Sequence, residues 1–299
     1  MDKHNDYFDL EKYTENIKLE PRILEHLEYT TSLFQEYFDK LSKYDSYSVI
    51  YFWIDSLFNE LNSSNNIEGL CTPSSILEND LFFDTLQISN NRIHKLHSFV
   101  YNGGSEKSSY RQKDVTVEGV VNGMPNVFYY PPKFTDVPKF MNDYIKFYKT
   151  KGIQTINSNP FIKASLCQLL FIRIHPYQDG NGRCGRMIQN IKFTEMINNL
   201  YGTNLKLCPL NISPRISDYK VQYCEMIDNI TFGLYKDTNH EINNYLNFML
   251  NMYDEQLYFL IQKLDKKSSV LESISKNQSL ESNDFIKTVD KMNIKRIRQ

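Results

Sequence analysis

The sequence predicts a mainly α-helical protein with one β-hairpin. Over most of the chain the apolar residues recur three or four positions apart, which is the period of one face of a helix. Glycine and proline, at 11 and 10 of 299 residues, are scarce outside a few clusters, so long stretches carry no helix breaker. One segment, residues 114–132, departs from the helical period and has the composition of two short strands.

The composition excludes several classes of protein. Hydrophobic residues make up 41% of the chain, enough for a sizeable core, and 34 basic against 36 acidic residues leave a net charge of −2. This balance predicts neither a nucleic-acid partner nor binding to a membrane surface. The longest clean apolar run, residues 49–54, is too short to span a bilayer. Five scattered cysteines fit no zinc or disulfide pattern, so we expect reduced thiols and a cytoplasmic protein.

The first half of the chain is predicted to contain helices. The opening 45 residues indicate a helical extension, and a further helix runs from residue 48 to about Leu61. Residues 62–66, Asn-Ser-Ser-Asn-Asn, either interrupt this helix or begin a second short turn. His94 and His97 lie three apart without a nearby Cys, Asp or Glu to complete a metal site, so we interpret them as two polar contacts on a helix.

The hairpin and the later helices follow in order. Within residues 114–132, β-branched and aromatic runs flank Asn122–Gly123, a dipeptide typical of a two-residue hairpin turn, and Pro131–Pro132 ends the second strand. The helical period returns afterwards, and the chain turns polar and then basic beyond Lys266. The predicted later helices cover residues 161–174 and about 184–200, 217–232 and 239–265.

The loop from His175 to Gly182 connects two of these helices. Pro176 disfavours helical geometry at His175, so the incoming helix should end there and present the imidazole at its carboxyl end. Gly180 and Gly182 allow backbone conformations closed to residues with a Cβ, so that successive N–H groups can converge on an anion. The loop leads into the amino terminus of the next helix, which also favours phosphate. We therefore expect a polyphosphate ligand.

Four side chains complete the chemistry of this loop. Arg183 and Arg186 add forked cationic donors, and Asp179 offers one hard oxygen ligand, which suffices for Mg²⁺ when nucleotide phosphates supply others. His175, the only histidine that we expect near the loop, is suited to accept a proton from a hydroxyl. A base, a metal ligand, an anion site and charge neutralisers are the parts of a phosphoryl-type transfer. The sequence has no P-loop motif as another route to ATP.

The residues from His175 to Arg186 read His-Pro-Tyr-Gln-Asp-Gly-Asn-Gly-Arg-Cys-Gly-Arg. This order closely resembles the signature of the Fic-domain family, His-Pro-Phe-x-Asp/Glu-Gly-Asn-Gly-Arg-x-x-Arg. The sole departure is Tyr177 in place of Phe, which should keep the packing of the ring. The resemblance covers roughly residues 48–230 and implies a Fic-type helical bundle with the hairpin as a flap over the active site.

The resemblance also implies an activity. Fic proteins transfer AMP from ATP to a Ser, Thr or Tyr hydroxyl of a target protein and release pyrophosphate. By this resemblance His175 would deprotonate the hydroxyl of a target, or of the protein itself, and Asp179 would hold Mg²⁺ between the α- and β-phosphates. A weaker likeness of residues 218–227 to a family segment near the adenine adds one residue to the nucleotide-binding set. That set is Gly180, Asn181, Gly182, Arg183, Arg186 and Tyr223.

The second strand of the hairpin resembles the Fic flap, which pairs main chain to main chain with the target segment. The residues that this likeness assigns to target binding are Val127, Phe128, Tyr129 and Tyr130. Without the signature, the same segment would be interpreted as an ordinary surface hairpin.

A further likeness concerns Ser64 and Glu68. They are four apart, share a face on a helical turn, and fit the Ser-x-x-x-Glu-Gly motif that lies upstream of the core in an inhibited Fic subclass. In that subclass the glutamate pairs with the second arginine of the signature, here Arg186, and places negative charge where the triphosphate must lie. The alternative interpretation is a surface helix that ends in Glu-Gly.

The leading hypothesis is an autoinhibited protein adenylyltransferase, with a homodimer implied by the family alone. Two alternatives stay open: Glu68 orients a water that removes AMP from a modified target, or the site is a nucleotide sensor with vestigial catalysis. The predicted parts are a helical extension (1–45), an inhibitory helix region (46–85), a Fic core (86–265) that includes the flap (114–132), and a polar tail (266–299).

Overall fold

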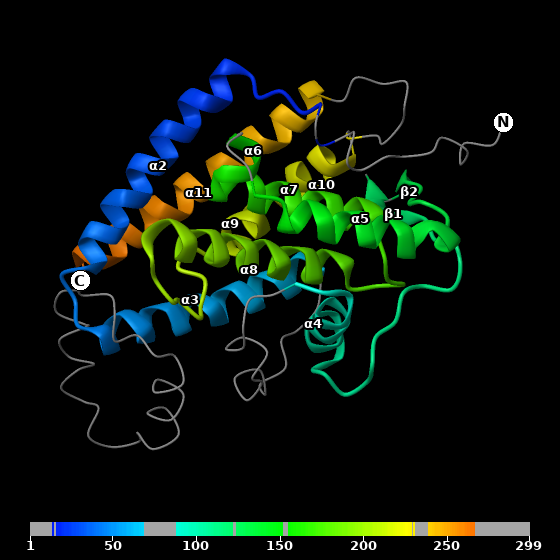
Figure 1. Ribbon diagram of the computed structural model, residues 1–299, viewed down its shortest axis with the longest axis horizontal. Helices are drawn as coiled ribbons and strands as arrows, with labels where there is room; N and C mark the ends of the chain where they lie inside the picture. Colours follow the sequence, from blue (N-terminus) through cyan, green and yellow to red (C-terminus); the bar gives the residue numbers. More distant parts are fainter. Residues whose placement is uncertain are drawn as a thin grey trace.

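The computed structural model describes Thr14 and residues 16–68, 88–121, 124–151, 155–228, 230 and 239–266. Within these ranges the chain folds into a bundle of helices, which confirms the predicted fold class (Figure 1). The described helices are α2 (Pro21–Leu41), α3 (Ser46–Ile67), α4 (Asn90–Asn102), the 3₁₀ turn η3 (Phe134–Asp136), α5 (Val137–Lys149), α6 (Thr155–Ser158), α7 (Pro160–Ile174), α8 (Asn181–Tyr201), α9 (Ser213–Asp218), α10 (Lys220–Asp228) and α11 (Asn239–Lys266).

Helix α7 is the centre of the bundle. All of its residues are buried, whereas the sequence predicted a single inward face. The helix is apolar almost all round, which is typical of a helix surrounded by others. Its buried charges have partners: the Lys163 ammonium donates to the carbonyl of Phe147 at 2.7 Å, and the Arg173 guanidinium donates to the carbonyl of Ile227 at 3.3 Å. The first turns of α7 are therefore tied to α5 through Lys163, and its last turn is tied to α10 through Arg173.

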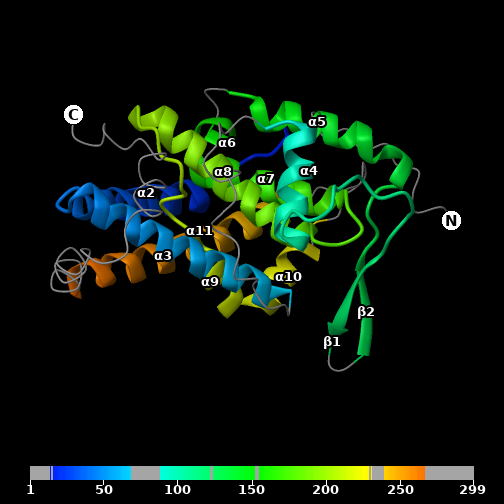
Figure 2. The same cartoon turned by 90° about the horizontal axis from the view of Figure 1, so that it is seen from below.

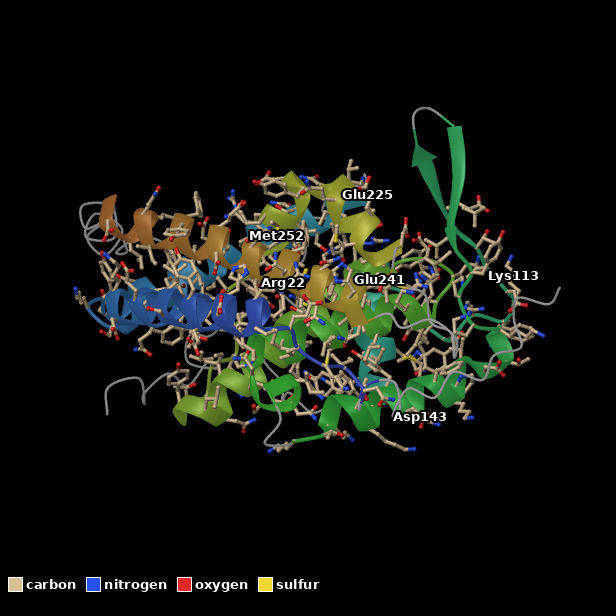
Figure 3. The ribbon with its side chains drawn as sticks, turned by 90° about the horizontal axis from the view of Figure 1, so that it is seen from above. Arg22, Lys113, Asp143, Glu225, Glu241 and Met252 are labelled. Carbon is tan, nitrogen blue, oxygen red and sulfur yellow. The ribbon has the colours of Figure 1, made fainter. Side chains whose placement is uncertain are left out.

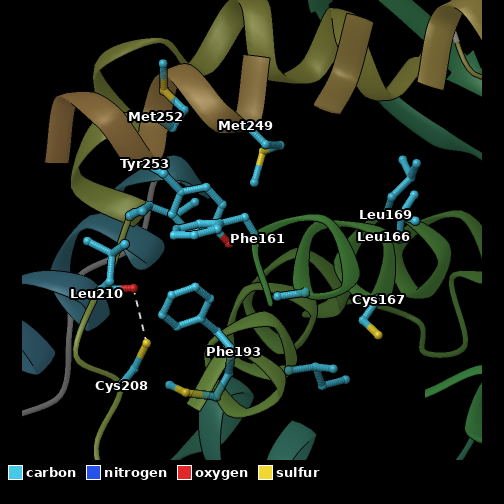
Figure 4. Close-up of a cluster of buried hydrophobic side chains, with 14 of the residues drawn as sticks. Phe161, Leu166, Cys167, Leu169, Phe193, Cys208, Leu210, Met249, Met252 and Tyr253 are labelled. Atoms are coloured by element: carbon cyan, nitrogen blue, oxygen red, sulfur yellow. Dashed lines mark hydrogen bonds between the residues drawn. The ribbon is translucent and has the colours of Figure 1, made fainter. Parts of the chain in front are cut away.

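An aromatic cluster fixes α7 against α8 and α11 (Figure 4). The ring of Phe161 lies 5.2 Å from that of Phe193 and 5.1 Å from that of Tyr253, centroid to centroid. Such pairs add to the energy of burial because ring edges and faces carry opposite partial charges. Beside them, the Cys208 thiol donates to the carbonyl of Leu210. The loop between α7 and α8 thus starts and ends on helices that cannot shift independently.

Helices α2 and α11 lie side by side although they come from opposite parts of the chain (Figure 1). Arg22, labelled in Figure 3, donates to the side chain of Asn244 on α11, and the backbone N–H of Glu20 donates to the side chain of Asn243. Among the described helices, none is both long enough and apolar enough to cross a membrane.

Two helix boundaries differ from those predicted. Helix α3 continues without a break to Ile67, because Ser64 and Asn65 are buried against the bundle and tertiary contacts outweigh the weak helix propensity of Ser and Asn. The helix predicted over 217–232 is divided at Tyr219 into α9 and α10, and Asn229 and residues 231–232 lie outside the described residues.

The predicted hairpin is present as an antiparallel pair of strands, β1 (Val117–Val121) and β2 (Met124–Tyr129). The predicted turn residues Asn122 and Gly123 lie outside the described residues. The two strands project from one end of the helical body (Figure 2). Of the described hairpin residues, Tyr129 at the base is buried against α7.

Candidate active site

The histidine of the signature loop has an unusual backbone conformation. Helix α7 ends at Ile174, as predicted, and His175 follows with φ 52° and ψ 58° in the left-handed region. It is the one non-glycine residue in the described part of the chain with a positive φ. Such a conformation costs free energy and is concentrated at functional sites. Two hydrogen bonds from Arg111 hold it, one from its Nε to the carbonyl of His175 and one from its N–H to that of Pro176, both 2.9 Å.

The His175 ring is mostly enclosed by protein. Burial lowers its pKa to about 4, against the opposing effect of a hydrogen bond with the carbonyl of Ile172; the guanidinium of Arg111 lowers the pKa further, and the carboxylates of Asp179 and Glu68 raise it by smaller amounts. The imidazole is therefore neutral at pH 7 and can accept a proton. Its Nδ1 lies 2.9 Å from the hydroxyl of Tyr129 on β2.

The glycines of the loop serve two different purposes. Gly180 has φ 78°, and a Cβ there would lie 2.9 Å from Nε2 of His97, so both conformation and space require glycine. Gly182 lies inside α8 with helical geometry, which the sequence did not predict. It is needed for close approach, because a Cβ on it would lie 2.3 Å from Oε1 of Glu68.

Asn181 and Asp179 brace the same loop. The Asn181 side chain accepts from the N–H of Tyr177 and donates to its carbonyl, both at 2.9 Å, so it holds the loop closed. Asp179 accepts the N–H of Gly180 at 2.6 Å, and its side chain is 64% exposed. The N-cap of α8 is Gly180, which has no side chain to cap the helix, and the first N–H groups of any helix lack an intrahelical partner. The loop therefore combines N–H groups that lack an intrahelical partner with an exposed carboxylate.

Two histidines lie behind the loop, which corrects the expectation that His175 is the only one near it. His97 Nε2 is 2.7 Å from the carbonyl of Asp179, and the His97 ring stacks on Tyr177 at 3.7 Å. His94 Nδ1 is 2.8 Å from the Tyr177 hydroxyl, a contact that the Phe of the family signature could not make. The His94–His97 pair thus consists of polar contacts on a helix, as predicted, but these contacts support the loop.

The two signature arginines differ in their surroundings. Arg183 is 6% exposed and donates to the carbonyl of Val100 near the end of α4, while its Nε has no hydrogen-bond partner among the described residues. Arg186 is 2% exposed and donates from Nε to the hydroxyl of Ser64 and from Nη2 to the carbonyl of Ser64, each at 2.8 Å. Both guanidinium groups are therefore held in place by neighbouring helices.

The predicted pairing of Glu68 with Arg186 is present. Glu68 Oε1 accepts from Nη2 of Arg186 at 2.8 Å. Burial raises the pKa of Glu68, but the attraction of Arg186 outweighs it, so the pKa is lowered and the carboxylate is charged. Its contact with Gly182 places this charge at the first turn of α8, where the helix favours an anion. The carboxylate of Glu68 therefore occupies the position expected of a phosphate.

Residues 87–191 match the Fic/DOC family. The chain carries a Fic/DOC family domain. Similar solved structures include a Fic family protein from Desulfovibrio desulfuricans G20, with 17% identity and a TM-score of 0.57 over 82% of this chain and 76% of that one. A Fic domain containing signaling protein from Bacteroides thetaiotaomicron VPI-5482 has 17% sequence identity and a TM-score of 0.57, over 80% of this chain and 97% of that one. Fic-1 from C. elegans has 14% sequence identity and a TM-score of 0.59, over 82% of this chain and 74% of that one. At these identities the likeness shows a shared fold, and no curated protein is significantly similar.

The residues of the hairpin that were predicted to bind a target differ in their exposure to solvent. Val127 and Tyr130 are 40% and 56% exposed, whereas Tyr129 is 6% exposed and lies against α7. The side chain of Phe128 lies outside the described residues. The carbonyls of Lys113, labelled in Figure 3, and Pro132 accept from the Arg111 guanidinium, which thereby ties the base of the flap to the His175 loop. Nothing in the sequence around Arg111 indicates this role.

Tyr223, predicted to lie near an adenine, is on α10 outside the matched Fic segment. It is 3% exposed and accepts a hydrogen bond from Gln168 at 3.0 Å. Its ring therefore offers no open surface to a base in this conformation. The hydroxyl interacts instead with the guanidinium of Arg186.

Sequence reasoning missed Glu60, a buried carboxylate one turn before Ser64 on α3. Glu60 accepts from the Asn190 side chain at 2.9 Å and from the N–H and hydroxyl of Ser213 at 2.8 and 2.6 Å. These contacts join α3 to α8 and α9. Glu60 is four positions before Ser64 and eight before Glu68, so the three residues lie on one face of a helix. This spacing in the sequence could have indicated that Glu60 faces the same side as the inhibitory residues.

Proposed function

We propose that this protein transfers AMP from ATP to a hydroxyl of a target protein, and that Glu68 holds it inactive. The observation that carries the proposal is the Glu68 carboxylate, which lies at the amino terminus of α8 and binds Arg186. The site attracts an anion strongly enough to keep a carboxylate of its own chain there. Removing that carboxylate would free the site for a triphosphate.

The transfer that we propose uses His175 as the base. The target hydroxyl loses its proton to the imidazole while its oxygen forms a bond to the α-phosphorus of ATP. The bond from that phosphorus to the bridging oxygen of the β-phosphate breaks, and pyrophosphate leaves. The N–H groups at the start of α8 and the guanidinium groups of Arg183 and Arg186 would neutralise the phosphate charge.

The residues fit a divalent cation in the manner of nucleotide enzymes. Asp179 is exposed close to the amino terminus of α8, and among the described residues no set of three His, Cys, Asp or Glu side chains forms a separate metal site. Mg²⁺ commonly takes one carboxylate and completes its shell with phosphates and water. Asp179 would hold the ion, which would supply positive charge beside the leaving phosphates.

Inhibition by Glu68 needs only a modest free energy. Keeping the protein about 99% closed requires roughly 2.7 kcal/mol. A hydrogen-bonded ion pair and the two bonds between Arg186 and Ser64 are sufficient for this amount, since hydrogen bonds to charged groups contribute about 1.5–3 kcal/mol each. The Glu68 side chain is 34% exposed, so water screens part of the pairing.

The test is intact-protein mass spectrometry after incubation with ATP and Mg²⁺. We expect Glu68→Gly to gain adenylyl groups on itself or on an added target extract, and wild type and Glu68→Gly/His175→Ala to gain none. The matched control is Asn66→Gly, because Asn66 is exposed on the last turn of α3. It places a glycine in the same helical turn, at a cost of a few tenths of a kcal/mol relative to Asn, without removing the carboxylate. Equal labelling of Asn66→Gly and Glu68→Gly would contradict the role of Glu68.

The two alternatives predict other products. A de-AMPylating enzyme would release AMP from a modified protein and would lose this activity in Glu68→Gly. A nucleotide sensor would bind ATP in Glu68→Gly, as measured by calorimetry, but label no protein in any extract. The retained His175, neutral and set in a strained turn, favours a catalytic role over the sensor.

A further inference from the structure

Tyr129 joins the flap to the proposed base. It is the last residue of β2, and its hydroxyl donates to the carbonyl of Ile172 at 2.6 Å while lying 2.9 Å from Nδ1 of His175. Its ring covers the guanidinium of Arg173 at 3.9 Å. Tyr129 is thus the side chain through which the hairpin reaches the reactive histidine.

The number of protons decides the direction of these hydrogen bonds. A tyrosine hydroxyl has one proton to donate, and a carbonyl can only accept. Because the Tyr129 proton goes to Ile172, the contact with His175 requires a proton on Nδ1, which donates to the Tyr129 oxygen. The other nitrogen, Nε2, then carries the lone pair that accepts a proton from a substrate.

This choice matters because the ring is neutral. Burial lowers the pKa of His175 to about 4, so at neutral pH only one ring nitrogen carries a proton and its partners decide which. The charged groups that act on the ring are Arg111, Asp179 and Glu68. None of them is the hydrogen-bond partner of Nδ1. The carbonyl of Ile172 also hydrogen-bonds to the ring, so the Tyr129 oxygen and this carbonyl, which the Tyr129 hydroxyl binds, act on the imidazole together.

The strand register explains how Tyr129 comes to lie there. Val117 pairs with Tyr129 and Glu118 pairs with Val127, so residue 128 is an extra residue on β2. A bulge of this kind changes the direction of the side chains that follow it. It lets Val127 remain exposed on the projecting strand while Tyr129 is buried at the end of α7.

We propose that Tyr129 is a positioning residue that sets the tautomer of His175, so that the hairpin and the base act as one unit. The catalytic consequence rests on the proposed function, whereas the tautomer does not. Any displacement of β2 at Tyr129 would remove the Tyr129 oxygen from Nδ1 and leave the ring with the carbonyl of Ile172 as its neutral partner. A target bound to the flap would therefore be presented to a base that the same strand holds ready.

The first experiment measures the tautomer by NMR of ¹⁵N-histidine-labelled protein at neutral pH, with His175→Ala for assignment. We expect His175 protonated at Nδ1 in wild type and a mixture of tautomers in Tyr129→Phe. The matched control is Tyr144→Phe, since the buried Tyr144 hydroxyl also donates to an α7 carbonyl, that of Cys167, but makes no hydrogen bond to any histidine in the described part of the chain. A wild-type ring protonated at Nε2, or an unchanged ring in Tyr129→Phe, would overturn the proposal.

The second experiment measures activity in the Glu68→Gly background. Tyr129→Phe should lower kcat about 10- to 100-fold and leave the KM for ATP unchanged, because a misplaced base affects proton transfer and not nucleotide binding. Tyr144→Phe should leave both values unchanged. Equal kcat values would refute the role of Tyr129 in catalysis, whereas the absence of transfer in every variant would refute the proposed function and leave the NMR result to decide the tautomer.

Discussion

At the scale of single residues, the pH below which the proposed reaction slows depends on the protonation of His175. Its pKa is lowered to about 4 by burial, so it can accept a proton at any pH well above that value. The Glu68 carboxylate raises the pKa of His175, so removing Glu68 should lower this pKa and not raise it. We therefore expect kcat/KM of Glu68→Gly to stay level from about pH 5.5 to 8, since this constant reports the free enzyme. Initial rates of adenylyl incorporation check it, and a half-maximal rate near the ordinary histidine value of about 6.5 would contradict it.

The effect of Gly180→Ala on the free energy of unfolding tests how tightly the loop packs against His97. Replacement by Ala imposes a left-handed conformation on a residue with a Cβ, at about 1–2 kcal/mol, and drives that Cβ to 2.9 Å from His97. Gly103 is the matched control, because its φ of 71° is similar and no atom lies within 4 Å of a Cβ there. Urea unfolding should show a larger loss of stability for Gly180→Ala than for Gly103→Ala. Equal losses would mean that His97 does not press on the loop.

At the scale of elements, Glu60 should hold the inhibitory helix. Glu60→Ala leaves the Asn190 and Ser213 donors buried without their acceptor, which costs about 1–3 kcal/mol, and it loosens α3 from α8 and α9. We expect lower stability in urea and a higher basal rate of adenylyl transfer, below that of Glu68→Gly. Asp55→Asn is the control on the same helix, since its ion pair with Lys263 is half exposed and contributes about 0–1 kcal/mol. Destabilisation by Glu60→Ala without any rise in basal transfer would contradict the prediction.

The elements also show what the sequence could predict. The hairpin and the end of α7 at Ile174 follow from local signals, Asn-Gly and His-Pro. The Glu68–Arg186 contact was expected only from the resemblance of the Ser64–Glu68 segment to the inhibitory motif of a known family. Contacts between distant segments carry no such signal. The contact between His97 and the loop joins residues 82 positions apart, and the inward position of Tyr129 depends on a bulge that alternation of side chains does not reveal. The continuation of α3 past Leu61 likewise depends on what Ser64 binds.

At the scale of the whole molecule, α2 is part of the bundle although the sequence suggested only a helical extension. Its side chains reach along α11 from Arg22 to Lys40, which pairs with Asp265. Because α11 also packs on α7, the two ends of the described chain are joined to the helix that leads to His175. The predicted division at residue 45 stays a prediction.

The contact between His26 on α2 and Asp254 on α11 makes the packing of these two helices depend on pH. His26 Nε2 is 2.7 Å from Asp254 Oδ2, and this hydrogen bond raises the pKa of His26 against the opposing effect of burial. Asp254 is 7% exposed and its Oδ1 has no hydrogen-bond partner among the described residues, so the charged imidazole is its main compensation. A raised pKa means that the folded protein binds the proton more tightly, so this stabilisation is complete below the unfolded value of about 6.5 and is lost as pH rises through the folded pKa.

We therefore expect wild type to exceed His26→Gln in free energy of unfolding by about 1.5–3 kcal/mol near pH 6, as for a hydrogen bond between charged groups. The difference should shrink steadily as pH rises above about 6.5. Comparison with the variant is essential, because burial lowers the pKa values of His94, His97 and His175 and these groups change stability in the opposite direction. Urea titrations across this range provide the measurement, with His240→Gln as the control because its pair with Glu20 is exposed. A difference that is constant with pH would show that His26 contributes by packing, so that α2 and α11 are joined without a charge that titrates.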